Sequence, residues 1–128
     1  MNIVVSETIR RLNIIKENLN DQADTNLYNS GINLANQCLR EAITSRIDEI
    51  VDLYGDEKAT SDVTNSDYAI SCIEYTDSLK KVFKELYDEQ DNTAFGRGYK
   101  SQVRKFFVAF KPIQEWLQKV SIENIYQS

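Results

Sequence analysis

The sequence contains no histidine, and this absence excludes several classes of mechanism. Without an imidazole there is no serine–histidine or cysteine–histidine couple, no histidine-ligated zinc and no histidine acid or base. Catalysis would need carboxylates, lysine, tyrosine or a metal held by carboxylates. The sequence also has no phosphate-binding loop and no cofactor fingerprint. We therefore expect a protein that is not an enzyme and that carries no cofactor.

Cysteine and long apolar runs are also scarce. Cys38 and Cys72 are too few for a disulfide framework or a four-cysteine metal site, and both fall in apolar patterns that predict core positions. No apolar run approaches the roughly 20 residues that a membrane span needs. The first residues lack the basic and apolar regions of a secretory signal. These features predict a cytoplasmic protein that does not enter a membrane.

Helix breakers are few, with four glycines and one proline in the whole chain. Apolar residues recur at intervals of three and four in several long segments, which is the pattern of an amphipathic helix. We expect Thr25 to cap the second helix, Gly55 to end it, and Asn65 or Ser66 to cap the third. A polar loop is predicted over 56–65. The expected helices cover residues 3–20, 28–54, 66–87 and 103–120.

The four apolar stripes predict the fold class. Each stripe can bury itself only against another, so the expected fold is an all-α, antiparallel four-helix bundle that forms one domain over residues 1–128. Pro112 lies inside the last helical pattern, where it removes a backbone hydrogen bond. We therefore expect a kink between Val108 and Pro112, or two shorter helices. A helical hairpin that completes its core as a homodimer stays open.

Charge is distributed unevenly along the chain. Residues 1–92 hold 9 Lys and Arg against 18 Asp and Glu, a net charge of −9, whereas residues 93–128 hold 6 against 2, a net charge of +4. Within the last segment four cations fall within a sector of about 60° on a helical wheel, beside Phe107. Gly96-Arg97-Gly98 is interpreted as a loop adjoining this stripe. The four cations are Arg97, Lys100, Arg104 and Lys111.

Three interpretations of this stripe stay open. It could face carboxylates of the preceding helices, bind phosphates or nucleic acid, or bind an acidic protein. Trp116 is expected on the side of the same helix opposite its apolar stripe, with Lys105 near it. Trp116 is interpreted either as packed against a loop or the C-terminal tail, or as an anchor for a partner. The candidate binding residues are Arg97, Lys100, Arg104, Lys105, Lys111 and Trp116.

Two acidic motifs raise an enzymatic alternative. Glu49-x-x-Asp52 and Glu74-x-x-Asp77 each place two carboxylates on one helix face, and neighbouring helices could bring all four together around Mg²⁺. This pattern over residues 48–77 resembles the all-α nucleoside triphosphate pyrophosphohydrolases, which pair Glu-x-x-Glu with Glu-x-x-Asp. Asp52 departs from it, since the family has glutamate there. The resemblance implies a Mg²⁺-dependent nucleotide hydrolase; otherwise these carboxylates form a solvated face and no metal is bound.

Together these features predict a small acidic helical protein that acts by binding another macromolecule, with a protein as the first choice of partner. Inhibitor, immunity-type, adaptor and phage or mobile-element accessory proteins all fit this description. Nucleic-acid binding through the basic stripe and Mg²⁺-dependent nucleotide hydrolysis are the alternatives. The identity of the partner, the biological process and the oligomeric state do not follow from the sequence.

Overall fold

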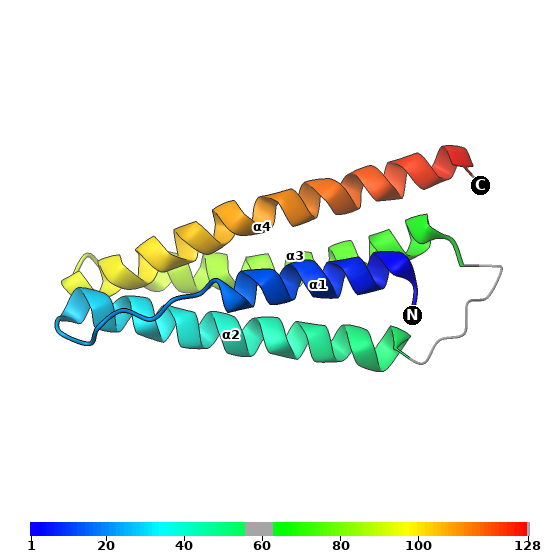
Figure 1. Ribbon diagram of the computed structural model, residues 1–128. Coiled ribbons are helices and arrows are strands. Elements are labelled where there is room, and N and C mark those ends of the chain that lie inside the picture. The colour runs from blue at the N-terminus through cyan, green and yellow to red at the C-terminus, as the bar shows by residue number, and fades with distance from the viewer. Residues whose placement is uncertain (56–62, 128) are drawn as a thin grey trace.

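The computed structural model describes residues 1–55 and 63–127, with the side chains of 123–127 left out. All regular structure in these residues is helical, and no strand is present among them. The prediction of an all-α helical bundle is confirmed. The helices are α1 (Ile3–Glu17), α2 (Leu27–Tyr54), α3 (Asn65–Glu89) and α4 (Ala94–Gln127) (Figure 1).

The four helices lie side by side along one axis. In Figure 1, α1 and α3 start at the end of the molecule where the N-terminus lies, and α2 and α4 start at the opposite end. The longest helix, α4, packs most extensively against α2 and α3. At the N-terminal end, the side chain of Asn2 donates a hydrogen bond to Asn65 (2.9 Å), and Ser66 Oγ donates to the carbonyl of Ser121 (2.7 Å). No helix in the described part of the chain has the length and apolarity that crossing a membrane requires.

Capping residues set the starts of α2 and α3, and two predicted caps are wrong by one residue or more. Asn26, not Thr25, has the extended backbone of an N-cap and accepts a hydrogen bond from the amide of Asn29 (2.8 Å). At α3 the cap is Thr64, which forms a capping box with Asp67. Most of the predicted 56–65 loop, residues 56–62, lies outside the described residues.

The helix α4 begins nine residues earlier than predicted, and the segment Gly96-Arg97-Gly98 is helical rather than a loop. The physical reason is a close crossing of two helix backbones. A Cβ atom on Gly98 would lie 2.0 Å from the carbonyl oxygen of Tyr28, and one on Gly31 would lie 2.0 Å from that of Phe95. The glycines therefore serve backbone packing between α2 and α4, and Gly31 does not interrupt α2.

Pro112 lies in the middle of α4, which continues as one helix to Gln127. The expectation of two shorter helices is therefore wrong. A bend at Pro112 stays a prediction, because proline removes the hydrogen bond to the carbonyl of Val108 without having to end the helix.

One hydrophobic core draws on all four helices. At its centre the ring of Phe106 lies 5.6 Å from that of Phe83 and stacks on Phe110 at 5.2 Å, measured between ring centroids. Cys72 is fully buried and Cys38 is half-buried against the core, which agrees with their predicted structural role. The core aligns the outer faces of α3 and α4 and so positions the charged side chains described next.

Candidate binding site

The outer surface of α3 and α4 carries five cations, and we call it the basic face. Two of them, Lys80 and Lys111, line the groove between these helices together with the carboxylates of Asp77 and Glu115. On α3, Asp77, Lys80 and Lys84 recur once per turn along the edge nearest α4, since side chains three or four residues apart share a helix face. The matching edge of α4 carries the predicted stripe beside Phe107. The cations of the basic face are Lys80, Lys84, Lys100, Arg104 and Lys111.

Tyr87 holds part of the basic face in place. Its ring lies 5.9 Å from Nζ of Lys100 and 6.0 Å from Cζ of Arg104, within the range of cation–π attraction. Lys100 also donates a hydrogen bond to the side chain of Asn92 (3.2 Å), and Arg97 donates to the carbonyl of Asn92 (2.6 Å). These contacts orient cations at the start of α4 around the connection from α3.

The basic face is poor in ion pairs. Among the described residues, Lys80, Lys84, Lys100 and Arg104 form no ion pair within 4.0 Å, and Lys111 pairs only with Glu115 of its own helix, at 3.9 Å. The carboxylate of Asp77 accepts a hydrogen bond from Gln114 instead (3.0 Å). The pKa of Asp91, in the connection before α4, is lowered by hydrogen bonds from Thr93 and also by the charge of Lys100. The three interpretations of the stripe therefore stay predictions.

Apolar side chains also lie on this surface. Phe107 is half-buried, and Val108 is 75% exposed although it lies in the middle of a helix. Both residues line a groove of about 690 Å³. An apolar strip with a charged border is the usual composition of a protein-binding surface. The groove is lined by Asp77, Lys80, Phe107, Val108, Lys111, Gln114, Glu115 and Gln118.

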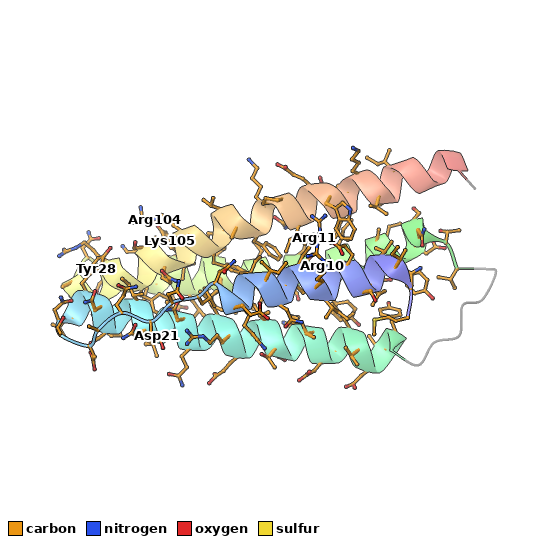
Figure 2. All side chains as sticks on the ribbon, in the orientation of Figure 1. Arg10, Arg11, Asp21, Tyr28, Arg104 and Lys105 are labelled. Atoms are coloured by element: carbon orange, nitrogen blue, oxygen red, sulfur yellow. The ribbon has the colours of Figure 1, made fainter. Side chains whose placement is uncertain are left out.

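The structure separates the predicted binding residues into two sets. Arg97, Lys100, Arg104 and Lys111 follow the α3 side of α4, whereas Lys105 and Trp116 lie on its other side. Figure 2 shows Arg104 and Lys105 on the early part of α4, toward the end of the bundle where Tyr28 lies in the first turn of α2. Sequence reasoning missed Lys80, Lys84 and Tyr87. The sequence shows that Lys80 and Lys84 share one helix face. It does not show which neighbouring helix that face meets, because this depends on tertiary packing.

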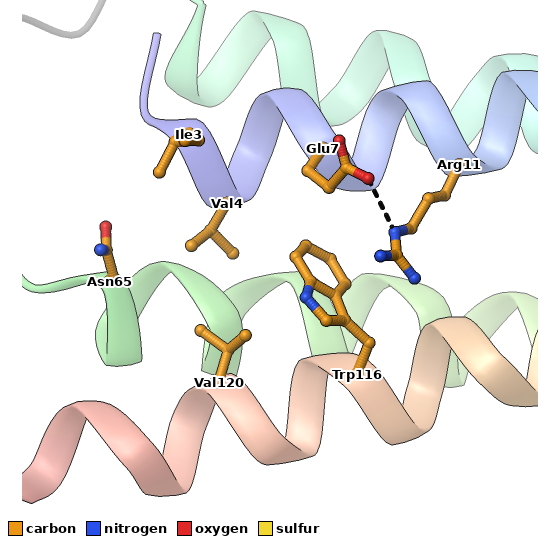
Figure 3. A pocket seen from close by; sticks show the side chains of 7 residues that line it. All are labelled: Ile3, Val4, Glu7, Arg11, Asn65, Trp116 and Val120. Carbon is orange, nitrogen blue, oxygen red and sulfur yellow. Dashed lines mark hydrogen bonds and ion pairs between the residues drawn. The ribbon is translucent and has the colours of Figure 1, made fainter.

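Trp116 packs against α1; the side chains of the tail from residue 123 lie outside the described ones. The guanidinium carbon of Arg11 lies 4.3 Å from the centroid of its ring. Together these side chains form one end of a cleft of about 420 Å³ between α1 and α4, the Trp116 cleft (Figure 3). The cleft is lined by Ile3, Val4, Glu7, Arg11, Asn65, Trp116 and Val120.

Glu7 is the acidic residue of this cleft. Arg11 Nε donates to its Oε1 (2.9 Å), and Arg10 Nε donates to its Oε2 (2.8 Å). Hydrogen bonds from Arg10 and then Arg11 lower the pKa of Glu7 to about 2. Two guanidinium groups therefore share one carboxylate, and the three side chains together carry a charge of +1.

The four carboxylates of the enzymatic alternative do not meet. Glu49 pairs with Arg46 one turn away (3.2 Å), and Asp77 is bonded to Gln114 on α4. In the part of the chain that the structure describes, no group of three or more His, Cys, Asp or Glu side chains is arranged to hold a metal ion. Glu49, Asp52, Glu74 and Asp77 therefore lack the arrangement that a shared Mg²⁺ site needs.

The described residues form a helical bundle with a groove lined by charged and apolar side chains on its surface. No model of a protein family, no curated protein and no solved structure matches this chain. Function is therefore inferred from the residues and their geometry.

Proposed function

We propose that this protein binds an acidic segment of a partner protein in the groove between α3 and α4. The observation that carries the proposal is that four of the five cations on the basic face form no ion pair within 4.0 Å among the described residues; these are Lys80, Lys84, Lys100 and Arg104. The chain contains 20 Asp and Glu, so pairing within the molecule would have been available. Unpaired cations gathered at one groove favour anionic groups supplied by another molecule.

The apolar strip favours a protein over other anionic partners. Val108 and Phe107 offer apolar contact area in the groove, whose charged lining residues are Asp77, Lys80, Lys111 and Glu115. Protein interfaces have this composition, with a buried apolar core and a polar rim. An amphipathic helix with leucine-like residues on one face and carboxylates beside them would match both features.

Charge also argues against nucleic acid as the primary partner. The formal net charge is −5, which repels a polyanion at long range, whereas a short acidic peptide meets mainly the local field of the basic face. An acidic protein segment carries fewer negative charges than a nucleic acid and also has apolar side chains. It is therefore the better match to a small cationic groove on an acidic molecule.

The test compares charge reversal on the two sides of α4. The probes are a fluorescein-labelled helical peptide with Glu and Leu on adjoining faces, and a labelled single-stranded DNA and RNA. We expect the peptide to bind in low salt, and the double variant Lys84→Glu with Arg104→Glu to lose at least about tenfold in affinity. Lys105→Glu is the control, since it reverses one cation on the other side of α4, and its affinity should stay within about twofold. The single variants Lys84→Glu and Arg104→Glu, which each reverse one cation as well, are compared with it directly.

Equal losses in the two variants would contradict the proposal, because net charge rather than the groove would then govern binding. Tighter binding of DNA or RNA than of the peptide would favour the nucleic-acid alternative. The natural partner can then be sought by capture from the native cell extract with the same two variants. A partner retained by Lys105→Glu and lost with the double variant would identify the ligand of the basic face.

The biological setting belongs to the same proposal. We expect the protein to work in the cytoplasm as an inhibitor, immunity-type protein, adaptor or mobile-element accessory protein. Homo-oligomerisation is measured independently by sedimentation of the purified chain. Self-association that disappears in the Lys84→Glu, Arg104→Glu variant would mean that a second copy supplies the acidic segment.

A further inference from the structure

The Trp116 cleft lies on the side of α4 that faces α1, away from the basic face, so it is independent of the function proposed above. Val4 of α1 and Val120 and Trp116 of α4 form its apolar walls (Figure 3). Ile3 is 72% exposed at its mouth, although it is a large apolar residue in the first turn of a helix. A volume of about 420 Å³ is within the range of small-molecule sites, and these sites are mostly apolar with a few polar groups that orient the ligand.

Arg11 is the polar group at one end of the cleft. Its Nε atom is bonded to Glu7, and its guanidinium stacks on Trp116. Among the described residues its two Nη atoms have no hydrogen-bond partner, and the side chain is 32% exposed. An incoming anion can therefore accept hydrogen bonds from Arg11 without displacing Glu7. The guanidinium is already held in position by Trp116, which reduces the entropy lost on binding.

Local charge favours an anion despite the presence of Glu7. Arg10 and Arg11 both donate to Glu7, which leaves a net charge of +1 on these three side chains. The opposite end of the cleft is apolar. Ile3 and Arg11 are eight residues apart on one helix, so the distance from the mouth to the charged end is about 12 Å. The cleft thus pairs a short apolar length with a single cationic terminus.

We propose that the Trp116 cleft binds a single-chain amphiphilic carboxylate, with the carboxylate on the Nη atoms of Arg11 and the alkyl chain between Val4, Trp116 and Val120. A ligand of this class satisfies both features at once. Its apolar chain covers the walls that water now contacts, and its charge complements the surplus cation. Neither a purely apolar ligand nor a small hydrophilic anion does both.

Trp116 is the only tryptophan in the chain, so intrinsic fluorescence reports directly on this cleft. The experiment titrates the full chain with decanoate below its micelle concentration. We expect a saturable change in fluorescence, and affinity that rises about fourfold for each methylene added from hexanoate to octanoate to decanoate. Decanol, which has the same chain without the charge, should bind at least about tenfold more weakly than decanoate.

Two arginine variants test the role of Arg11. Arg11→Gln should weaken decanoate binding at least about tenfold. Arg10→Gln is the comparison variant: Arg10 contacts Glu7 and contributes to the local charge but does not line the cleft, so this variant should weaken decanoate binding less than Arg11→Gln does. Circular dichroism checks that both variants fold. The comparison of decanoate with decanol on the unmodified chain tests the same point if a variant does not fold.

Several results would overturn the inference. They are the absence of a saturable change, equal affinity for decanoate and decanol, and equal losses in the two arginine variants. Fluorescence that depends on protein concentration without ligand, together with a dimer in sedimentation, would mean that a second copy fills the cleft. Loss of peptide binding at the basic face would leave this result unaffected, because the two sites lie on different sides of α4.

Discussion

At the scale of single residues, two glycines decide how closely α2 and α4 approach. Gly31 and Gly98 lie where the two backbones cross, and each occupies a position where a Cβ atom would meet a carbonyl oxygen of the other helix at 2.0 Å. A Cβ atom essentially never lies closer than 3.0 Å to such an atom, so one of the two backbones would have to shift. Helix propensity and packing therefore oppose each other at these positions.

The first prediction concerns Gly31→Ala. Alanine favours a helix over glycine by about 1 kcal/mol, but here the added methyl group has no space, and overpacking of this kind costs about 1–3 kcal/mol. We expect a net decrease in the free energy of unfolding, measured by urea denaturation. Ser45→Ala, at an exposed position of α2, is the control and should change it by less than about 0.5 kcal/mol. A more stable Gly31→Ala would show that the crossing is not tight.

Asn36 and Gln102 form a polar contact inside the apolar core. Asn36 is 0% exposed; its Oδ1 accepts a hydrogen bond from Gln102 (2.6 Å), and its Nδ2 donates to the carbonyl of Asn20 (2.9 Å). The contact therefore joins α2, α4 and the segment after α1. The carboxylate of Asp21 also accepts a hydrogen bond from Nδ2 of Asn36 (3.1 Å). Figure 2 shows Asp21 on the segment between α1 and α2.

A double-mutant cycle tests this contact. Asn36→Leu alone leaves the amide of Gln102 buried without its partner, and we expect a loss of about 1–3 kcal/mol in the free energy of unfolding. The double variant Asn36→Leu with Gln102→Leu should lose less than the sum of the two single variants, by at least about 0.5 kcal/mol. Additive losses would mean that the two side chains act independently.

At the scale of elements, the charged edge of α1 links stability to pH. Arg10 and Arg11 lower the pKa of Glu7 from its ordinary value of 4.5 to about 2, so the folded chain favours the ionised carboxylate. The associated stabilisation is fully present above pH 4.5 and is lost as the pH falls toward 2. We expect the Glu7→Gln variant to lack this pH-dependent contribution to the free energy of unfolding.

The measurement is the difference in unfolding free energy between the unmodified chain and Glu7→Gln at a series of pH values. It should be constant near neutral pH and shrink between pH 4.5 and 2. Glu17→Gln is the control, because Glu17 lies exposed at the end of α1 and forms no ion pair with a described residue. A difference that does not change with pH would show that the contacts of Glu7 contribute nothing to stability.

The helix α4 carries its own prediction at Pro112. Proline here removes one backbone hydrogen bond, so Pro112→Ala should restore the bond to Val108 and raise the free energy of unfolding by about 1–3 kcal/mol. Gln118→Ala, an exposed change later in α4, should have an effect below about 0.5 kcal/mol. A less stable Pro112→Ala would mean that a bend at this residue is required for the second half of α4 to pack.

At the scale of the whole molecule, the shared core predicts cooperative unfolding. Buried residues from all four helices belong to one cluster, so no helix has a core of its own. We expect one urea transition, with coincident midpoints from helical circular dichroism and from the fluorescence of Trp116. An earlier transition by fluorescence would show that the end of the bundle holding the Trp116 cleft opens before the rest.

The sequence predicted the helical class and three of the five cations of the basic face, but not the whole site. Arg97, Lys100, Arg104 and Lys111 could be grouped because they belong to one helix and follow its period. Lys80 and Lys84 could not be joined to them, because nothing in the pattern of one helix specifies which side of its neighbour it meets. The start of α4 was misplaced because glycines were interpreted as loop residues, although they serve a helix crossing.

By itself, the amino-acid order determined an all-helical protein with an acidic body and a basic last segment, because apolar periodicity and charge are local properties of a chain. The tertiary structure alone decided which faces meet. It brought α3 lysines beside the α4 stripe, separated the four carboxylates of the enzymatic alternative, and placed Trp116 against Arg11. These outcomes depend on helix rotation and close packing, and both are set by the complete core rather than by any single segment.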